Sequence, residues 1–168
     1  MRRTRPRTMS RTSAEAQAER LVATYADMIL RLSYSYLHTT VDAEDICQTV
    51  LLRTMTNAPF FSGPEHERAW IIRTTINACK DLLKSSARRT TVALEAAGEP
   101  EAPEPPDATV TDAVARLPYD QREAIYLHYY EGYPISEVAR LVGASEAAVT
   151  KRLSRARATL RHTLGDQS

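Results

Sequence analysis

The chain has 168 residues, of which 43% are hydrophobic, and its formal net charge is +1 at pH 7. This length suits one ordinary domain or two small ones, and no apolar run approaches the roughly 18 residues that a membrane helix requires. The basic stretch at residues 1–13 is not followed by the apolar segment of a secretory signal. We therefore expect a disordered basic tail over 1–13, a cytoplasmic location and no insertion into a membrane.

The small net charge conceals an uneven distribution along the chain. Residues 1–89 carry 14 Lys and Arg against 9 Asp and Glu, whereas residues 90–112 carry 6 acidic residues and no basic one. Residues 90–110 also hold four of the nine prolines and almost no large apolar side chain. Such a segment cannot bury enough surface to fold and repels itself. It predicts a flexible acidic linker over 90–110 between an N-terminal domain at 14–89 and a C-terminal domain at 111–168.

Helical periodicity dominates the N-terminal half. Apolar residues recur at steps of three and four at Leu21, Tyr25, Met28, Leu32 and Tyr36. After the turn "HTTVD", Asp42 or a neighbouring threonine is a suitable cap for a second helix, and Glu44 and Asp45 lie in its first turn. A third helix is expected over about 65–86, after the loop "APFFSGP". Because no strand-like alternation competes, the sequence predicts an all-α protein.

The two cysteines, Cys47 and Cys79, both lie in helical patterns. His38 and His66 are the histidines that would complete a zinc set with them, but no CxxC or HxxxH spacing supports one. We expect buried structural thiols, no metal site and no cofactor.

The C-terminal half ends in two helical patterns separated by one glycine, in "PISEVARLVGASEAAVTKRLSRAR". Gly143 permits the positive φ of a tight turn, and Ser145 is a suitable N-cap for the following helix. Lys151 and Arg155 face away from the leucine stripe of that helix, and Arg152 flanks them. A solvated surface helix would also carry such charges, but the spacing is typical of a DNA-binding helix-turn-helix.

Three segments together resemble the bacterial RNA polymerase sigma factors of the extracytoplasmic-function (ECF) group. They are "DAEDICQTVLL" at 42–52, "AWIIRTTINACKDLLKSSARR" at 69–89 and "LPYDQREAIYLHYYEGYPISEVARLVGASEAAVTKRLSRARATLR" at 117–161. The resemblance implies two helical domains, sigma regions 2 and 4. Region 2 would bind the clamp of core RNA polymerase and open the −10 promoter element, and region 4 would bind the polymerase flap and read the −35 element. It also implies regulation by an anti-sigma factor that covers both domains.

The resemblance assigns three groups of residues. The core-polymerase group is Asp42, Glu44, Asp45, Gln48 and Thr49. The −10 group is Phe60, Phe61, Ser62, His66, Arg68, Arg73, Asn77, Lys80 and Lys84. The −35 group is Ser145, Glu146, Ala148, Lys151, Arg152 and Arg155. An acidic helix start can equally be ordinary helix-end charge, and at least one of Phe60 and Phe61 can equally be a core residue, as can Trp70.

A second hypothesis is a helix-turn-helix regulator that binds duplex DNA without polymerase and uses its N-terminal half as a sensor or dimerisation domain. That half has no evident ligand motif, which favours the sigma factor. An enzyme is disfavoured because the sequence has no phosphate-binding glycine loop, no HExxH and no nucleophile elbow.

Overall fold

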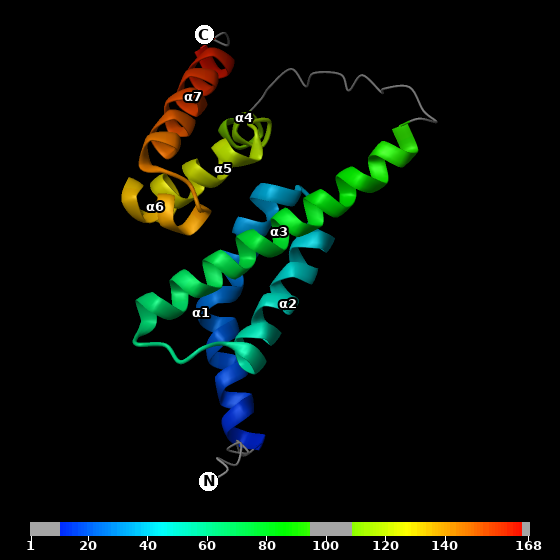
Figure 1. Ribbon diagram of the computed structural model, residues 1–168, viewed down its shortest axis with the longest axis vertical. Coiled ribbons are helices and arrows are strands. Elements are labelled where there is room, and N and C mark those ends of the chain that lie inside the picture. The colour runs from blue at the N-terminus through cyan, green and yellow to red at the C-terminus, as the bar shows by residue number, and fades with distance from the viewer. Residues whose placement is uncertain (1–10, 95–108, 166–168) are drawn as a thin grey trace.

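The computed structural model describes residues 11–94 and 109–165. These residues form helices and turns and contain no strand, which confirms the predicted all-α class. The N-terminal half contains α1 (Arg11–Leu37), α2 (Thr40–Asn57) and α3 (Pro64–Leu94). The C-terminal half contains α4 (Val110–Ala115), α5 (Tyr119–Ile125), the π-helical segment η1 (Tyr126–Tyr130), α6 (Ile135–Val142) and α7 (Glu146–Gly165). Figure 1 shows α4–α7 grouped beside the long diagonal α3.

The helix boundaries differ from the predicted domain boundaries at two places. Helix α1 begins at Arg11, inside the segment predicted as a tail, and α3 continues to Leu94, inside the predicted linker. The longer α3 has a simple cause, because the sequence contains neither proline nor glycine between Pro64 and Gly98. The rest of the predicted tail and linker, at 1–10 and 95–108, lies outside the described residues.

Local capping chemistry explains the helix starts. Thr39 has an extended backbone at φ −124°, and its hydroxyl accepts a hydrogen bond of 3.1 Å from the Asp42 backbone N–H. The threonine rather than Asp42 is therefore the cap of α2. Thr109 and Asp112 form a reciprocal capping box at the start of α4.

The two halves share one hydrophobic core. The N-terminal half buries Leu32, Val50, Ile71, Ile72 and Ile76, and the C-terminal half buries Leu127, Val138, Val149 and Leu153. These residues belong to a single continuous cluster, in which α5 packs on α1 and α6 packs on α3. The segments expected to be separate domains are therefore packed directly against each other.

Arg122 on α5 joins the halves through the backbone. Its guanidinium donates to the carbonyl oxygens of Ser35 and Tyr36 near the end of α1, and also to Ala115 and Leu117 of its own half. The last carbonyls of a helix have no partner within the helix, so the arginine satisfies groups that would otherwise remain bare. Arg122 thus links the two halves, because a side chain of the C-terminal half caps carbonyl groups near the end of α1.

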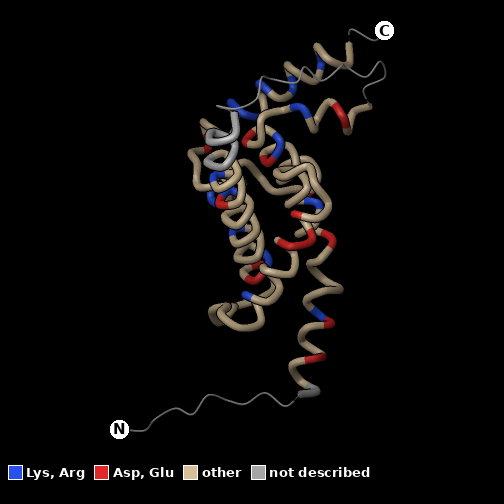
Figure 2. The backbone as a smooth tube through the Cα atoms, turned by 90° about the vertical axis from the view of Figure 1, so that its right-hand side faces the viewer, with Lys and Arg blue, Asp and Glu red and all other residues tan. Residues whose placement is uncertain are grey.

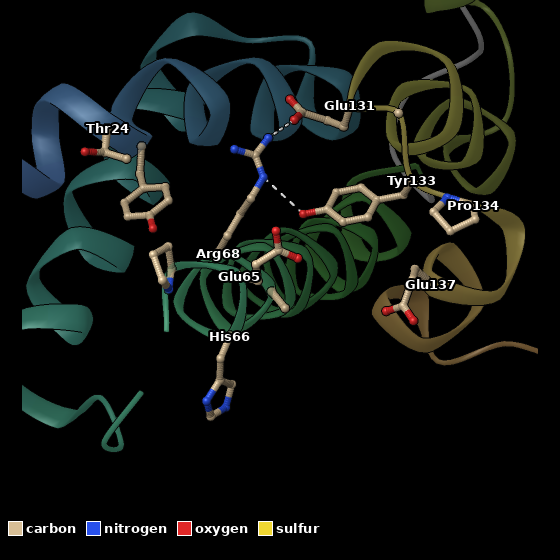
Figure 3. A pocket seen from close by; sticks show the side chains of 12 residues that line it. Thr24, Glu65, His66, Arg68, Glu131, Tyr133, Pro134 and Glu137 are labelled. Carbon is tan, nitrogen blue, oxygen red and sulfur yellow. Dashed lines mark hydrogen bonds and ion pairs between the residues drawn. The ribbon is translucent and has the colours of Figure 1, made fainter. Parts of the chain in front are cut away.

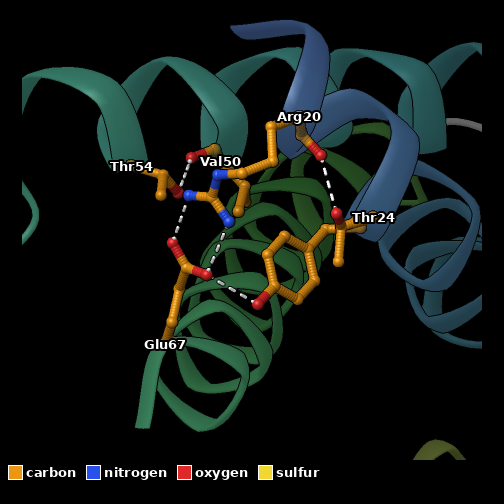
Figure 4. A network of polar contacts seen from close by, with 6 residues as sticks. Arg20, Thr24, Val50, Thr54 and Glu67 are labelled. Atoms are coloured by element: carbon orange, nitrogen blue, oxygen red, sulfur yellow. Dashed lines mark hydrogen bonds and ion pairs between the residues drawn. The ribbon is translucent and has the colours of Figure 1, made fainter. Parts of the chain in front are cut away.

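A second polar network stabilises the N-terminal half from within (Figure 4). The Arg20 guanidinium donates two hydrogen bonds, of 2.7 and 3.0 Å, to the two carboxylate oxygens of Glu67, and the Tyr25 hydroxyl adds a third of 2.8 Å. These bonds fix the first turn of α3 against α1. The hydrogen bonds from Arg20 lower the pKa of Glu67 below its ordinary value, although burial alone would raise it.

We expect Arg20→Ala to lower the free energy of unfolding by about 2 kcal/mol at pH 7, because Glu67 would remain buried with only Tyr25 as a partner. Since the folded pKa of Glu67 is depressed, this stabilisation is complete above the ordinary carboxyl pKa and is lost as the pH falls through the folded value. Urea denaturation at pH 7 and pH 3 measures both effects.

Arg140→Ala is the control, because Arg140 is exposed and pairs with Glu137 on the same helix. This substitution should lower the free energy of unfolding by less than about 0.5 kcal/mol. Equal losses for the two variants at pH 7 would contradict the prediction.

Candidate nucleic-acid interface

Helices α6 and α7 form a helix-turn-helix. Gly143 ends α6 in the left-handed conformation at φ 69°, and the Ser145 hydroxyl accepts a hydrogen bond of 3.1 Å from the Ala148 backbone N–H. Val138 and Ala139 on α6 pack with Val149 on α7 in the core. The predicted turn and the predicted cap are both confirmed.

The exposed face of α7 carries most of the predicted −35 residues. Ser145, Glu146, Lys151 and Arg155 are exposed, and Ala148 is half-buried. Leu153 and Ala156 are buried on the opposite face and hold the helix in place. Basic positions recur along α7 toward the C-terminus (Figure 2). This face can place cations and small polar groups in a major groove.

Arg152 differs from the other predicted −35 residues. Its Nη1 lies 3.0 Å from Oε1 of Glu123, and its Nε lies 3.5 Å from Oδ2 of Asp120. Because Glu123 is fully buried, its carboxylate draws the flanking guanidinium toward α5. In this arrangement the Arg152 guanidinium forms ion pairs with two carboxylates of α5.

The predicted −10 residues on α3 separate into two groups. The first group is His66, Arg73, Asn77 and Lys84, which are all exposed. At about 100° per residue they fall within a band about 40° wide on one face of the helix. No ion pair involves Arg73 or Lys84 within residues 11–94 and 109–165. These four side chains form an exposed polar and basic row along α3 that a nucleic-acid strand can follow.

Arg68 and Lys80 form the second group, because both contact the C-terminal half. Arg68 lies on the core-facing side of α3, where it forms an ion pair with Glu131 and donates a hydrogen bond of 3.0 Å to the Tyr133 hydroxyl (Figure 3). Lys80 lies at the edge of the exposed face, with its Nζ 3.8 Å from Oε2 of Glu123.

The two phenylalanines in the loop before α3 differ in their exposure to solvent. Phe60 is 94% exposed, whereas Phe61 is half-buried and packs edge-on against His66 and Trp70, with ring centroids 5.5 and 5.8 Å apart. The Ser62 backbone N–H donates to Nδ1 of His66 at 3.2 Å and holds the loop against the helix. Phe61 and Trp70 are thus packing residues, and Phe60 remains available to stack on a base.

Helix α2 presents three of the five predicted core-polymerase residues on an exposed face. Glu44, Asp45 and Gln48 are exposed, whereas Asp42 and Thr49 are half-buried. The Thr49 hydroxyl donates to the Asp45 carbonyl at 2.9 Å and is occupied within the helix.

Sequence reasoning missed the apolar part of this face. Val41 is 69% exposed and Leu52 is 62% exposed, and Met55 follows one turn later. Steps of three and four join these residues to the acidic ones, so that one stripe carries both kinds of side chain. The signal was available, because Val41 and Leu52 are spaced to share a face with Glu44, Asp45 and Gln48. We call Val41, Glu44, Asp45, Gln48, Leu52 and Met55 the α2 stripe.

Sequence reasoning also missed Glu123, for which no local signal exists. In the segment "DQREA" it has the pattern of an exposed helix residue, yet its side chain is fully buried between α3 and α7. Burial raises the pKa of Glu123 to about 8, while Arg152 opposes the shift. The charged groups that face it are Lys80 on α3 and Arg152 on α7; Asp120 on α5 shares Arg152 with it.

Cys47 and Cys79 are both buried, as predicted, and the Cys47 thiol lies 3.8 Å from the Ala26 carbonyl. Of the helices in the described ranges, none combines the length and apolar character of a membrane span.

Comparison with known proteins assigns the chain to a protein family. The family model of Sigma-70 region 2 matches residues 21–89, and that of Sigma-70 region 4 matches residues 108–160. The ECF RNA polymerase sigma factor SigM of Mycobacterium tuberculosis is 32% identical over 150 residues, which cover 83% of this chain and 76% of SigM. The probable RNA polymerase sigma factor RfaY of Xanthomonas campestris is 31% identical over 159 residues, but the match spans only 40% of RfaY.

The fold is also found among solved structures. The sigma factor RpoE of Bartonella quintana, in complex with the anti-sigma factor NepR, superposes with a TM-score of 0.68 at 21% identity, over 88% of this chain and 96% of that one. Both sigma regions are thus present in the expected order, on the helices that carry the exposed basic faces. The chain belongs to the RNA polymerase sigma factors of the extracytoplasmic-function group, which direct the polymerase to specific promoters.

Proposed function

We propose that the chain binds core RNA polymerase through the α2 stripe. A face that combines carboxylates with exposed apolar side chains suits a basic partner helix, because the charges steer association and the apolar groups supply buried area. Leu52 and Met55 are the expected anchors, and Asp45 and Gln48 are the expected polar contacts.

The two basic faces are assigned to the two promoter elements. The exposed face of α7 enters the major groove of the −35 element, where Lys151 and Arg155 contact phosphates and base edges. The exposed face of α3 follows the opened −10 strand, and Phe60 stacks on an unpaired base. The observation that carries this proposal is the presence of two exposed basic faces in one chain with a separate acidic and apolar face on α2.

The chain has no catalytic role in this proposal, which requires no cofactor. The polymerase makes the RNA, and the chain acts beside it in the cytoplasm. The structurally similar RpoE of Bartonella quintana is held by the anti-sigma factor NepR. We propose that an anti-sigma factor likewise regulates this chain.

Promoter binding with and without core polymerase tests the proposal. Gel-shift titrations of a promoter fragment should give a specific complex only when core polymerase and the chain are both present. Specific binding of duplex DNA by the chain alone, unchanged by the polymerase, would instead establish a regulator that acts without polymerase.

A further inference from the structure

A cavity of about 340 Å³ beside α4, α5 and η1 is lined mainly by aromatic and aliphatic side chains. We call it the tyrosine groove; its apolar lining consists of Val114, Ile125, Tyr126, Tyr129 and Tyr130. Tyr129 is 54% exposed and Tyr130 is 57% exposed. None of the lining residues belongs to the three groups assigned to DNA or polymerase, so the groove is a separate surface.

The tyrosine rings are held in position by the protein itself. In the π-helical segment, Tyr126 and Tyr130 stack with ring centroids 5.2 Å apart and an angle of 17° between the ring planes. The Tyr126 hydroxyl donates a hydrogen bond of 2.7 Å to Glu131, and the Tyr129 hydroxyl accepts one of 3.0 Å from Arg157. Because the rings are already ordered, a ligand that packs on them costs little side-chain entropy. Short π-helical segments are also frequent at functional sites.

Two arginines contact the rings of the groove. The guanidinium of Arg31 lies over Tyr130, 5.1 Å from the ring centroid, and Arg157 holds the hydroxyl of Tyr129. Arg31 also pairs with Asp27 one turn earlier on α1, but both side chains are largely exposed, so that pair is weak. The groove therefore suits a ligand that presents an apolar edge beside an acidic one.

The chain contains a segment with these two edges. In "PEAPEPP", Pro100, Pro103 and Pro106 recur at every third residue, and Glu101 and Glu104 follow the first two prolines. A polyproline II helix has three residues per turn, so this spacing places the prolines on one edge and the glutamates on the next. Grooves lined by aromatic side chains bind such proline edges in known recognition domains.

The end of this segment is within reach of the groove. Pro106 precedes Val110, the first residue of α4, by four residues, which can span about 13 Å. Val114, which lines the groove, lies about 6 Å further along α4. Residues 95–108 carry five acidic residues and no basic one, which complements the two arginines. A ligand tethered this closely has an effective concentration of about 1 mM, so an affinity of about 0.1 mM gives about 90% occupancy.

We propose that the tyrosine groove binds residues 100–106 of the same chain as a polyproline II helix. The proline edge packs on the tyrosine rings, and the acidic edge faces Arg31 and Arg157. The groove is thus an intramolecular proline-binding site. The proposal goes beyond the assigned contacts with promoter and polymerase, and it stands or fails independently of them.

Paramagnetic relaxation in the full chain measures this binding. A nitroxide is attached to Ala102→Cys, a position on neither the proline edge nor the acidic edge. It should broaden the backbone amide signals of Val114, Tyr129 and Tyr130, while the signals of the loop at 58–62 stay sharp. The native cysteines are buried and should react slowly with the label. Sharp signals at the groove would overturn the proposal.

A change of proline register separates specific binding from tethering or charge. Pro103→Glu/Glu104→Pro keeps the composition and the net charge of the segment but moves one proline off its edge, and it should abolish the broadening. Pro105→Ala leaves both edges intact and should retain the broadening. If the register variant keeps the broadening of the wild type, then the segment is held near α4 without recognition of its prolines, and the proposal is wrong.

Substitutions in the groove test the other partner. Tyr129→Leu/Tyr130→Leu removes both rings while keeping apolar side chains, and it should release the nitroxide-labelled segment. Tyr34→Leu is the matched control, because Tyr34 is 48% exposed on α1 and does not line the groove. The register variant changes no residue of the described helices, so it keeps the test decisive if the tyrosine variant unfolds. Equal broadening in a folded tyrosine variant and in the control would contradict the assigned groove.

A peptide experiment identifies the occupant. A synthetic peptide of residues 98–108 is added to a chain in which residues 99–107 are replaced by a Gly-Ser stretch of equal length. It should shift the Tyr129 and Tyr130 signals with an affinity of about 0.1 mM. An absence of shifts at peptide concentrations up to about 1 mM would overturn the proposal. Tighter binding of decaproline than of the peptide would show that the groove serves a proline-rich partner and would overturn the assignment of the chain's own segment.

Discussion

Lys151→Ala/Arg155→Ala is expected to lower the affinity for promoters that carry the preferred −35 sequence by about 100-fold, at about 1–2 kcal/mol for each contact. Both side chains are exposed on α7, while Leu153 between them is buried and fixes their direction. Neither takes part in an ion pair in the described part of the chain, so the substitutions should leave the fold unchanged. Fluorescence anisotropy with labelled promoter DNA and core polymerase measures the effect.

The control removes the same charge from other positions of α7. Arg157 donates a hydrogen bond to the Tyr129 hydroxyl, and Arg161 lies one turn further toward the end of the helix. Arg157→Ala/Arg161→Ala should lower the affinity by about fivefold or less, through the loss of nonspecific attraction alone. If both double variants lose affinity equally and for all −35 sequences, then α7 supplies only net charge and does not read the element.

Glu44→Lys/Asp45→Lys is expected to lower the affinity for core RNA polymerase by about 100-fold, because reversing charge at a complementary interface costs several kcal/mol. The two carboxylates are exposed on α2 and lie beside the apolar Val41 on the same stripe. Biolayer interferometry with immobilised core polymerase gives the affinity. Thermal unfolding of each variant checks that α2 still folds.

The matched control for charge reversal is Glu15→Lys/Glu19→Lys on α1. These residues are exposed and produce the same change in net charge away from the α2 stripe. Their affinity for polymerase should stay within about threefold of the wild type. An equal loss in both double variants would mean that the polymerase senses the overall charge of the chain and that α2 is not its docking helix.

The helix-turn-helix was predictable in detail because its determinants are local. Gly143 and Ser145 act through their own backbone and the next turn, and the leucine spacing of α7 defines its buried face without reference to other elements. The cap of α2 was predicted less closely, because the sequence left both Asp42 and a neighbouring threonine open, and the structure has Thr39 as the cap.

The engagement of Arg152, Lys80 and Arg68 could not be predicted, because it depends on partners that are distant in sequence. Glu123 lies 29 residues from Arg152 and Glu131 lies 63 residues from Arg68. Periodicity placed all of these cations on helices, but it did not show which helix face meets another element. The packing of the two halves against each other was not predicted either. The acidic linker indicated two separate domains, and the sequence pattern did not show which of their surfaces are in contact.

The most direct test of the central assignment is run-off transcription with purified core polymerase, with and without the chain, across a library of −35 and −10 sequences. Transcripts should appear only when the chain is added and should depend on both elements, with the −35 dependence reduced by Lys151→Ala/Arg155→Ala. If no transcript depends on the chain, while the chain alone binds a specific duplex, then it is a stand-alone regulator and the roles assigned here to α2 and α3 are wrong.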